Sequence, residues 1–196
     1  MSNAKKQAPA AKTQDAGSAL MVRLTVTLFA ICAVCALLLG LVNAATAQRI
    51  KDVQDEKNAA ARAAVLPAGS PETEQVAYTG TDSTILEAYK AGDAAYVFRV
   101  APAGSFGGGL EIMVGVSKDG SNYTVSGVEI VQSNETSGLG ANAKKPAFRE
   151  QFVGKSGEVK VTKDGGEIDA LTGATITSRA VSAGVTSALA AAATLD

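Results

Sequence analysis

With 196 residues, the chain is long enough for one small domain and additional segments. Its formal net charge is −1 and it contains no histidine, so the composition gives no support for nucleic-acid binding and excludes hydrolases that need a histidine base. Twenty glycines and few aromatic residues are typical of a small domain with many loops and some strands.

The N-terminal region predicts a tail followed by a membrane span. Residues 1–18 are polar and rich in alanine, lysine and glutamine, which favours a short disordered tail. Residues 24–42 form a run of nineteen residues without a charge. As a helix with about 1.5 Å per residue, this run would be roughly 28 Å long, close to the thickness of the bilayer hydrocarbon. We therefore predict a cytoplasmic tail over residues 1–23 and a transmembrane helix over residues 24–45.

The charges beside the span predict its orientation. Lys5, Lys6, Lys12 and Arg23 precede it, and residues of both signs follow it, so the positive-inside rule places the N-terminus in the cytoplasm and the main domain outside. A cleaved signal peptide is the alternative, because residues 45–47 (Ala-Thr-Ala) match an A-x-A cleavage site. The long apolar run and the long tail before it favour a retained single-pass anchor in the cell membrane.

Both cysteines, Cys32 and Cys35, lie inside the predicted span. Their C-x-x-C spacing is compatible with a redox or metal site, but the chain has no other cysteine and no histidine to complete one. We interpret them as small apolar residues on one helix face and predict no metal site.

The region after the span predicts a helical stalk and then a domain. Residues 46–66 have a helix-forming composition and should continue the membrane helix until Leu66-Pro67 ends it. Residues 67–196 should form the extracytoplasmic domain, which begins with a polar connector over residues 67–80. Three segments have strand character, and a turn at residues 118–120 should join the last two as an antiparallel hairpin. These segments are residues 94–101, 110–116 and 123–132.

The last third of the chain predicts a shorter strand and two helices. Residues 158–161 are a strand candidate, and residues 141–152 favour a short helix that Pro146 interrupts early. Residues 178–193 are rich in alanine and valine and predict a C-terminal helix. Hairpins combined with few helices indicate an α+β fold rather than a doubly wound sheet.

Two glycine-rich segments superficially resemble nucleotide-binding loops. Residues 138–143 (GLGANA) match G-x-G-x-x-A, but that fingerprint requires a strand leading directly into a helix, and Pro146 follows closely. Residues 105–109 (SFGGG) lack the Gly-Lys-Ser/Thr ending of a P-loop. Neither segment predicts a nucleotide-binding fold of those two kinds.

The segment over residues 169–178 (DALTGATITS) directly precedes the C-terminal helix. Gly173 and Ala174 would leave room for a phosphate, and the N–H groups and positive dipole end of the helix would attract an anion. An ordinary helix start, capped by threonine or serine, is the alternative. Composition alone leaves both interpretations open.

This segment resembles the flavinylation motif of the FMN-binding domain family. In that family an ApbE-type flavin transferase moves FMN from FAD onto the last threonine of S/T-G-A-T. Residues 106–115, 135–140 and 148–155 resemble further parts of the same domain. Together with one N-terminal span, the chain resembles the G subunits of Rnf complexes, which are ion-translocating ferredoxin:NAD oxidoreductases. Ser137 stands where the family usually carries proline, so its loop should be less rigid.

The resemblance implies a flavoprotein that relays electrons to neighbouring membrane subunits of an Rnf-type complex, with no catalytic residue or independent activity of its own. It implies a phosphoester between FMN and Thr175, and recognition of Asp169 by the flavin transferase. Backbone and hydroxyl groups near Thr175 would surround the phosphate, and the loop from residue 135 would approach the ring. The expected cofactor contacts are Thr172, Gly173, Ala174, Thr177, Glu135, Thr136, Gly138, Leu139 and Gly140.

The sequence leaves the role of Glu135 open. It fits a hydrogen bond to the flavin ring, a hydrogen bond to the backbone, or a solvated carboxylate in a loop. Two other functions are also compatible with the chain. The C subunit of a sodium-translocating NADH:quinone oxidoreductase contains the same domain, although such subunits are typically longer. A membrane-anchored binding module without redox activity would use T-G-A-T only to cap a helix.

Overall fold

The computed structural model describes residues 11–195, which divide into two compact units between residues 53 and 54. The first helix, α1 (Ala11–Val65), runs across this division. Residues 1–10 of the predicted tail lie outside the described residues. Residues 11–18 were also predicted to be disordered, and that prediction was wrong. Their alanine, lysine and glutamine favour helix, and extending an existing helix requires no new nucleation.

The part of α1 in the first unit has an apolar surface that nothing in the structure covers. Every residue from 20 to 53 is exposed, including Phe29 and the leucines of the predicted span. This is the one helix among the described residues that is long and apolar enough to cross a membrane. The hydroxyls of Thr25 and Thr27 donate to carbonyls four residues earlier, at 2.9 and 2.8 Å. These hydroxyls are therefore satisfied within the helix, as a lipid environment requires.

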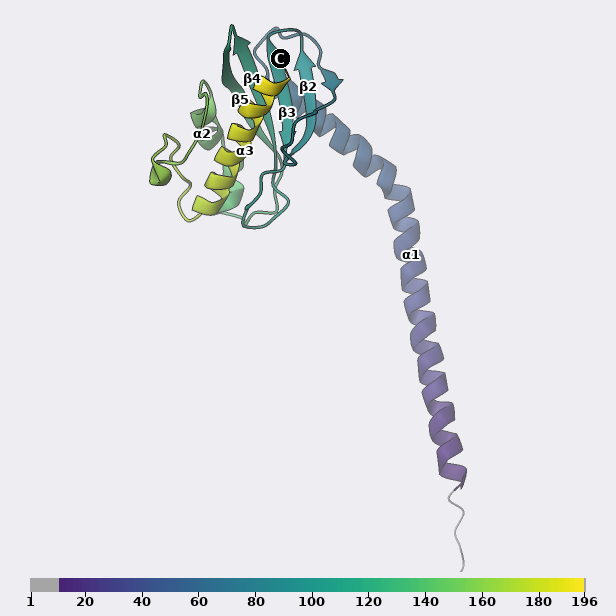
Figure 1. Ribbon diagram of the computed structural model, residues 1–196. Coiled ribbons are helices and arrows are strands. Elements are labelled where there is room, and N and C mark those ends of the chain that lie inside the picture. Colours follow the sequence, from purple (N-terminus) through teal and green to yellow (C-terminus); the bar gives the residue numbers. More distant parts are fainter. Residues whose placement is uncertain (1–10, 196) are drawn as a thin grey trace, which may run out of the picture. The chain divides into compact units, whose positions relative to one another are not determined.

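The second unit is built on a five-stranded antiparallel sheet in which each strand pairs with its neighbour in sequence (Figure 1). The α+β fold predicted from the sequence is confirmed, as are the three predicted strands, which are β3, β4 and β5. The strands are β1 (Glu74–Val76), β2 (Ile85–Ala91), β3 (Ala95–Val100), β4 (Glu111–Asp119) and β5 (Asn122–Gln132).

The predicted hairpin joins β4 to β5. Asp119 pairs with Asn122, so the turn consists of Gly120 and Ser121 and lies slightly later than the sequence indicated. Strand β2 has no counterpart among the predicted strands. A register shift between Ile85 and Glu87 puts its buried residues three apart, which hides the alternation typical of a half-buried strand.

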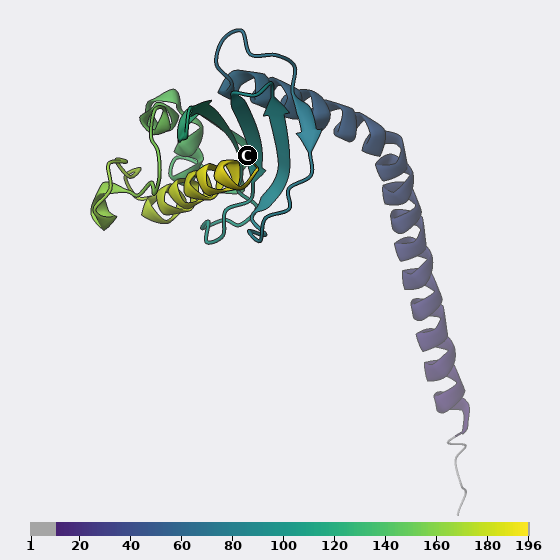
Figure 2. The same ribbon diagram turned by 45° about the horizontal axis from the view of Figure 1, so that its top comes forward.

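Helix α3 (Thr175–Thr194) crosses one face of the sheet (Figures 1 and 2). Val181 and Val185 of α3 are fully buried in one apolar cluster with Phe98, Ile112 and other residues of the sheet. The helix begins three residues before the predicted start at Ser178. This difference matters for function, because it places Thr175 in the first turn of the helix.

The last turns of α1 pack on the opposite face of the sheet. Ala61 and Val65 form an apolar cluster with Val97 and Met113. The compact unit accordingly begins at Gln54, inside the segment expected as a stalk. Where α1 ends at Val65, as Leu66-Pro67 predicted, it lies directly over a pair of facing glycines, Gly115 on β4 and Gly127 on β5.

Short helices fill the segment between β5 and α3. They are η1 (Gly140–Lys144), α2 (Pro146–Arg149), η2 (Glu150–Phe152) and η3 (Thr162–Asp164). Residues 141–152, expected as a short helix that Pro146 interrupts early, are helical in three short pieces, and the interruption lies at Pro146, which lacks an N–H and starts α2. The predicted strand over residues 158–161 was wrong, since only Val161 pairs there, in an isolated bridge with Ile168.

Candidate functional site

The candidate site lies where α3 begins. Ala174 is the residue before the helix, and its carbonyl accepts the bond from the N–H of Ser178, at 3.0 Å. The N–H groups of Thr175 to Thr177 therefore precede the first regular bond of the helix and point out of its end. Together with the helix dipole, they make this end of α3 favourable for an anion.

The segment before Thr175 turns back onto the helix. The N–H of Ala174 donates to the carbonyl of Leu171 at 2.9 Å, and the N–H of Leu171 donates to Oγ of Ser178 at 3.0 Å. Gly173 closes this turn with a φ of +74°, which side chains rarely tolerate. A Cβ at Gly173 would lie 3.0 Å from Cδ2 of Leu139. The Thr-Gly-Ala-Thr segment and the loop around residue 139 are thus in direct contact.

A cavity of about 360 Å³ lies at this contact. Eight of the expected contact residues line it, drawn from the two loops that the sequence singled out. They are Glu135, Thr136, Leu139, Gly140, Gly173, Ala174, Thr175 and Thr177. Thr172 and Gly138 do not line it, and both are exposed. Asp169 is exposed outside the cavity as well.

Three residues of the cavity were missed by sequence reasoning: Phe106, Lys163 and Ile176. Phe106 and Ile176 are exposed large apolar side chains, and so is Leu139. Residues 54–195 expose only two others of this kind, Leu86 and Val153. Exposed apolar side chains concentrated around one cavity indicate a surface for an apolar part of a ligand.

Lys163 places a positive charge at the polar end of the cavity. Its Nζ lies 3.2 Å from Oγ1 of Thr175. The short helix η3 carries Lys163, and the next residue, Asp164, is bound to Arg179 of α3 by two hydrogen bonds of 2.7 and 2.6 Å. These hydrogen bonds hold the pKa of the Asp164 carboxyl below its ordinary value of 3.8. The ion pair ties η3 to the first turns of α3, which keeps Lys163 beside Thr175.

No motif in the sequence singles out residues 163–166 (KDGG) as part of a site. A lysine twelve positions before a threonine carries no periodic signal, so Lys163 could be found only once η3 was seen to fold against α3.

Glu135 joins the three segments that form the cavity. Its side chain is buried, with 9% exposure, and it accepts a hydrogen bond from the N–H of Gly107 at 3.1 Å and another from Oγ1 of Thr177 at 2.7 Å. A Cβ at Gly140 would lie 2.5 Å from one of its oxygens. Of the possibilities that the sequence left open, the structure places Glu135 in hydrogen bonds to the backbone and to Thr177, away from bulk water.

The loop that contains Leu139 is shaped by its own backbone. The carbonyl of Thr136 accepts hydrogen bonds from the N–H groups of Leu139 and Ala141, at 3.1 and 3.2 Å. The side chain of Asn142 donates to the carbonyl of Gly138 at 2.7 Å. These bonds project the side chain of Leu139 outward at the edge of the cavity without help from the proline that Ser137 replaces.

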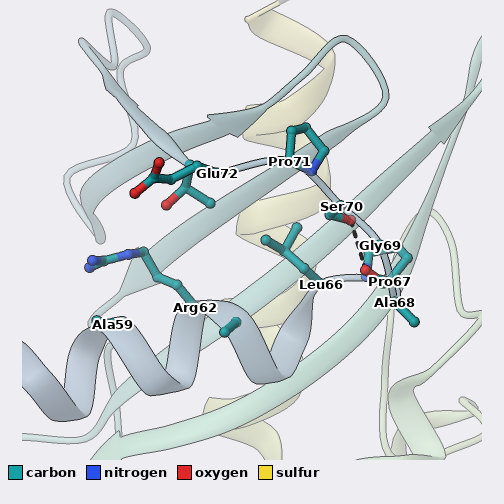
Figure 3. A pocket seen from close by; sticks show the side chains of 11 residues that line it. Ala59, Arg62, Leu66, Pro67, Ala68, Gly69, Ser70, Pro71 and Glu72 are labelled. Atoms are coloured by element: carbon teal, nitrogen blue, oxygen red, sulfur yellow. Dashed lines mark hydrogen bonds between the residues drawn. The ribbon is translucent and has the colours of Figure 1, made fainter.

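A second cavity, of about 410 Å³, lies between the end of α1 and the connector that follows it (Figure 3). Arg62 and Ala63 line it from the helix, and Leu66 to Thr73 line it from the segment that follows. The guanidinium of Arg62 lies 4.5 Å from the centre of the Tyr89 ring. None of the residues that the sequence predicted for function lies in this cavity.

Comparisons with known proteins identify the domain that contains the first cavity. Residues 105–190 match the FMN-binding domain family, and this range contains every residue that lines the cavity. The chain is 35% identical over 187 residues to the G subunit of the Na⁺-translocating ferredoxin:NAD⁺ oxidoreductase complex of Acetobacterium woodii, covering 85% of this chain and 88% of the relative.

A second relative is the G subunit of the ion-translocating oxidoreductase complex of Methanosarcina acetivorans. It is 33% identical over 170 residues, covering 82% of this chain and 88% of the relative. Among solved structures, the chain is similar to the C subunit of the Na⁺-translocating NADH-quinone reductase of Parabacteroides distasonis, with a TM-score of 0.48 and 20% identity. That match covers 74% of this chain and 92% of the other.

Proposed function

This chain belongs to the family of G subunits of ion-translocating oxidoreductase complexes, and we propose that it carries FMN covalently, through a phosphoester bond to Oγ1 of Thr175. The chain is a membrane-associated flavoprotein component of such a complex. When bound, FMN supplies the redox chemistry, and the protein supplies position and electrostatic environment. The observation that carries the proposal is the placement of Thr175 in the cavity, at a helix N-terminus and beside a lysine.

The polar end of the cavity fits a phosphate diester. Oγ1 of Thr175 lies within hydrogen-bond distance of Lys163, whose charge would balance the single negative charge of the diester. The N–H groups at the start of α3 offer additional donors. The hydroxyl of Thr177 is already committed to Glu135, so we assign Thr177 to holding the cavity in shape rather than to the phosphate.

The apolar end of the cavity fits the isoalloxazine ring. Phe106, Leu139 and Ile176 come from three different segments and expose apolar surface around one opening. A flat ring placed among them would cover surface that is otherwise in water, at about 25 cal/mol for each Å². The buried carboxylate of Glu135 would fix the spacing between these segments.

Attachment of FMN is a phosphoryl transfer that consumes FAD. Oγ1 of Thr175 would attack the phosphorus on the riboflavin side of FAD, the bond from that phosphorus to the bridging oxygen would break, AMP would leave with that oxygen and the bonding electron pair, and the proton of the threonine hydroxyl would pass to water. Lys163 would stabilise the negative charge that develops around Oγ1. A flavin transferase of the ApbE type would perform this step and would recognise the exposed Asp169.

A covalent bond keeps the cofactor in place although the cavity is open to solvent. Such a flavin can meet neighbouring membrane subunits at the domain surface and exchange electrons with them. We place the N-terminus in the cytoplasm and the FMN-binding domain on the extracytoplasmic side, because the cationic residues Lys12 and Arg23 precede the span.

The proposal is tested by co-expressing the chain with an ApbE-type flavin transferase. The denatured protein is then examined by intact mass and by in-gel flavin fluorescence. We expect one FMN on the wild type and on Thr162→Val, a matched loss of an exposed threonine outside the motif, and no FMN on Thr175→Val. A wild type without covalent FMN, or a Thr175→Val variant that still carries it, would disprove the proposal.

A further inference from the structure

One side chain outside the flavinylation segment holds the backbone of Asp169. The N–H of Asp169 donates to Oε1 of Gln151 at 2.7 Å, and the carbonyl of Asp169 accepts from Nε2 of Gln151 at 3.4 Å. A single carboxamide therefore pairs with both polar backbone groups of one residue, as a neighbouring strand would. The carboxylate of Asp169 is exposed and makes no ion pair or hydrogen bond within residues 11–195.

Gln151 stands on a rigid support. It lies in η2, next to Phe152, which is fully buried. The ring of Phe152 packs edge to face against the ring of Phe148, with 5.3 Å between the ring centres. Nε2 of Gln151 is also 3.4 Å from the carbonyl of Ala147, which limits rotation of the carboxamide. The apolar core beneath η2 therefore contributes to the position of Asp169, together with the preceding residue Ile168, which is fully buried and hydrogen-bonded through its backbone to Lys160 and Thr162.

The segment between Asp169 and Thr175 is held at its other end by α3, through the hydrogen bond from Leu171 to Ser178. We propose that Gln151 is a positioning residue for cofactor attachment, which presents the Asp169 carboxylate to the flavin transferase at a fixed distance from Thr175. This inference rests on the proposed function, since it concerns how the chain is recognised during attachment of FMN. Glutamine suits the task because it donates and accepts at once, which glutamate and leucine cannot do.

The inference predicts an effect on recognition rather than on chemistry. A segment that is already ordered loses little conformational freedom when the transferase binds, so its affinity is higher. Without the carboxamide, the two hydrogen bonds to Asp169 are lost, and the backbone of Asp169 must be ordered during binding, while Ile168 and Leu171 stay held by their own hydrogen bonds. We expect the KM for the acceptor chain to rise about tenfold, with kcat changed by less than about twofold, because Thr175 and Lys163 are held by other elements.

The experiment uses the full chain in detergent with the flavin transferase, FAD and magnesium. Covalent FMN is measured against time at several concentrations of the acceptor chain. Gln151→Leu should show the higher KM, and Gln75→Leu, the same change at an exposed glutamine on β1, should behave like the wild type. Gln151→Glu keeps the acceptor and loses the donor, so its KM should also rise. Wild-type KM values in both Gln151 variants would overturn the inference.

A double-mutant comparison separates positioning from a general structural role. If Gln151 acts through Asp169, then Gln151→Leu combined with Asp169→Asn should have the same KM as Asp169→Asn alone. If the double variant instead raises KM by the product of the two single effects, the inference is overturned. Where Asp169→Asn leaves no measurable transfer, the comparison is made with Asp169→Glu. Amide hydrogen exchange gives an independent readout: the Asp169 N–H should exchange faster in Gln151→Leu. A wild type that accepts no FMN would instead disprove the proposed function.

Discussion

Two of the places in the domain where a glycine lets another segment approach closely have opposite results. Under the end of α1, a Cβ at Gly115 would lie 2.1 Å from the carbonyl oxygen of Val65, so the two glycines of the facing pair let the helix end rest directly on the sheet. Beside α3, Gly173 forms a tight turn, but a Cβ there would meet only one methyl group of Leu139, at 3.0 Å. The first approach is filled by protein, and the second leaves a cavity.

The residues at the two places also differ in their exposure to solvent. At the first, the carbonyl of Val65 accepts a hydrogen bond from Ser126 at 2.6 Å, and Val65 is almost completely buried. At the second, Lys163 and apolar side chains remain exposed to solvent around Thr175. We infer that the α1 contact contributes stability and that the α3 cavity is kept open for a ligand. Substitutions at one place should therefore leave the property of the other unchanged.

Gly115→Val should disturb the first place most strongly. The added side chain overlaps the backbone of Val65, so the end of α1 must leave the sheet, and we expect a loss of roughly 3 kcal/mol in the free energy of unfolding. Thermal unfolding followed by tyrosine fluorescence measures this loss. Gly40→Val is the control, because a Cβ at Gly40 has no atom within 4 Å. Equal stability of the two variants would show that α1 does not depend on the glycine pair.

Lys163→Met should have a smaller effect, and only on the cofactor. A hydrogen bond to a charged group contributes about 1.5–3 kcal/mol, so the rate of FMN transfer to Thr175 should fall roughly tenfold to a hundredfold. The unfolding midpoint should stay unchanged, since Lys163 is exposed. Lys163→Arg, which keeps the charge, should recover part of the rate. If Lys163→Met instead lowered the unfolding midpoint and left the rate of FMN transfer normal, Lys163 would serve stability and not the cofactor.

A still smaller effect, on stability beside the cavity, should depend on pH. Because Arg179 lowers the pKa of Asp164 in the folded chain, this ion pair stabilises the fold above the ordinary aspartate value of 3.8, and its contribution disappears as the pH falls through the lowered pKa. Asp164→Asn should thus lower the unfolding midpoint at neutral pH, and the difference from the wild type should shrink toward zero in acid. A difference that does not vary with pH would contradict the assignment. Asp169→Asn, at an exposed aspartate without an ion pair, is the control.

Much of the fold could be predicted from local patterns. The uncharged run in α1 and the strand character of the residues in β3, β4 and β5 are properties of neighbouring residues, and the structure confirmed the helix and the three strands. The errors occurred where a distant contact decides. The bulge in β2 is set by its pairing with β3, and the segment over residues 158–161 has no partner strand beyond one bridge. The interruption at Pro146, by contrast, is a local effect of its missing N–H and was expected.

Some residues of the candidate site could likewise be predicted from local motifs, and others could not. Two loops, around residues 135–140 and 172–177, were identifiable because each carries a compact motif that resembles one family, and they do meet at one cavity. Phe106 and Gln151 lie in segments that resemble the same family, but no local pattern assigned their side chains to the site, and Lys163 lies in a segment without such a resemblance. The buried hydrogen bond between Glu135 and Thr177 joins residues 42 positions apart.

Composition and short runs of residues were enough to establish an apolar anchor, an α+β domain and a threonine motif of the FMN-binding family, because each of these is a property of neighbouring residues. Three other features emerged with the packed domain: α1 is part of its core from residue 54, Lys163 faces Thr175, and Gln151 holds Asp169. Such contacts require the packing of several elements at once, and short-range patterns carry no information about which distant side chains that packing brings together.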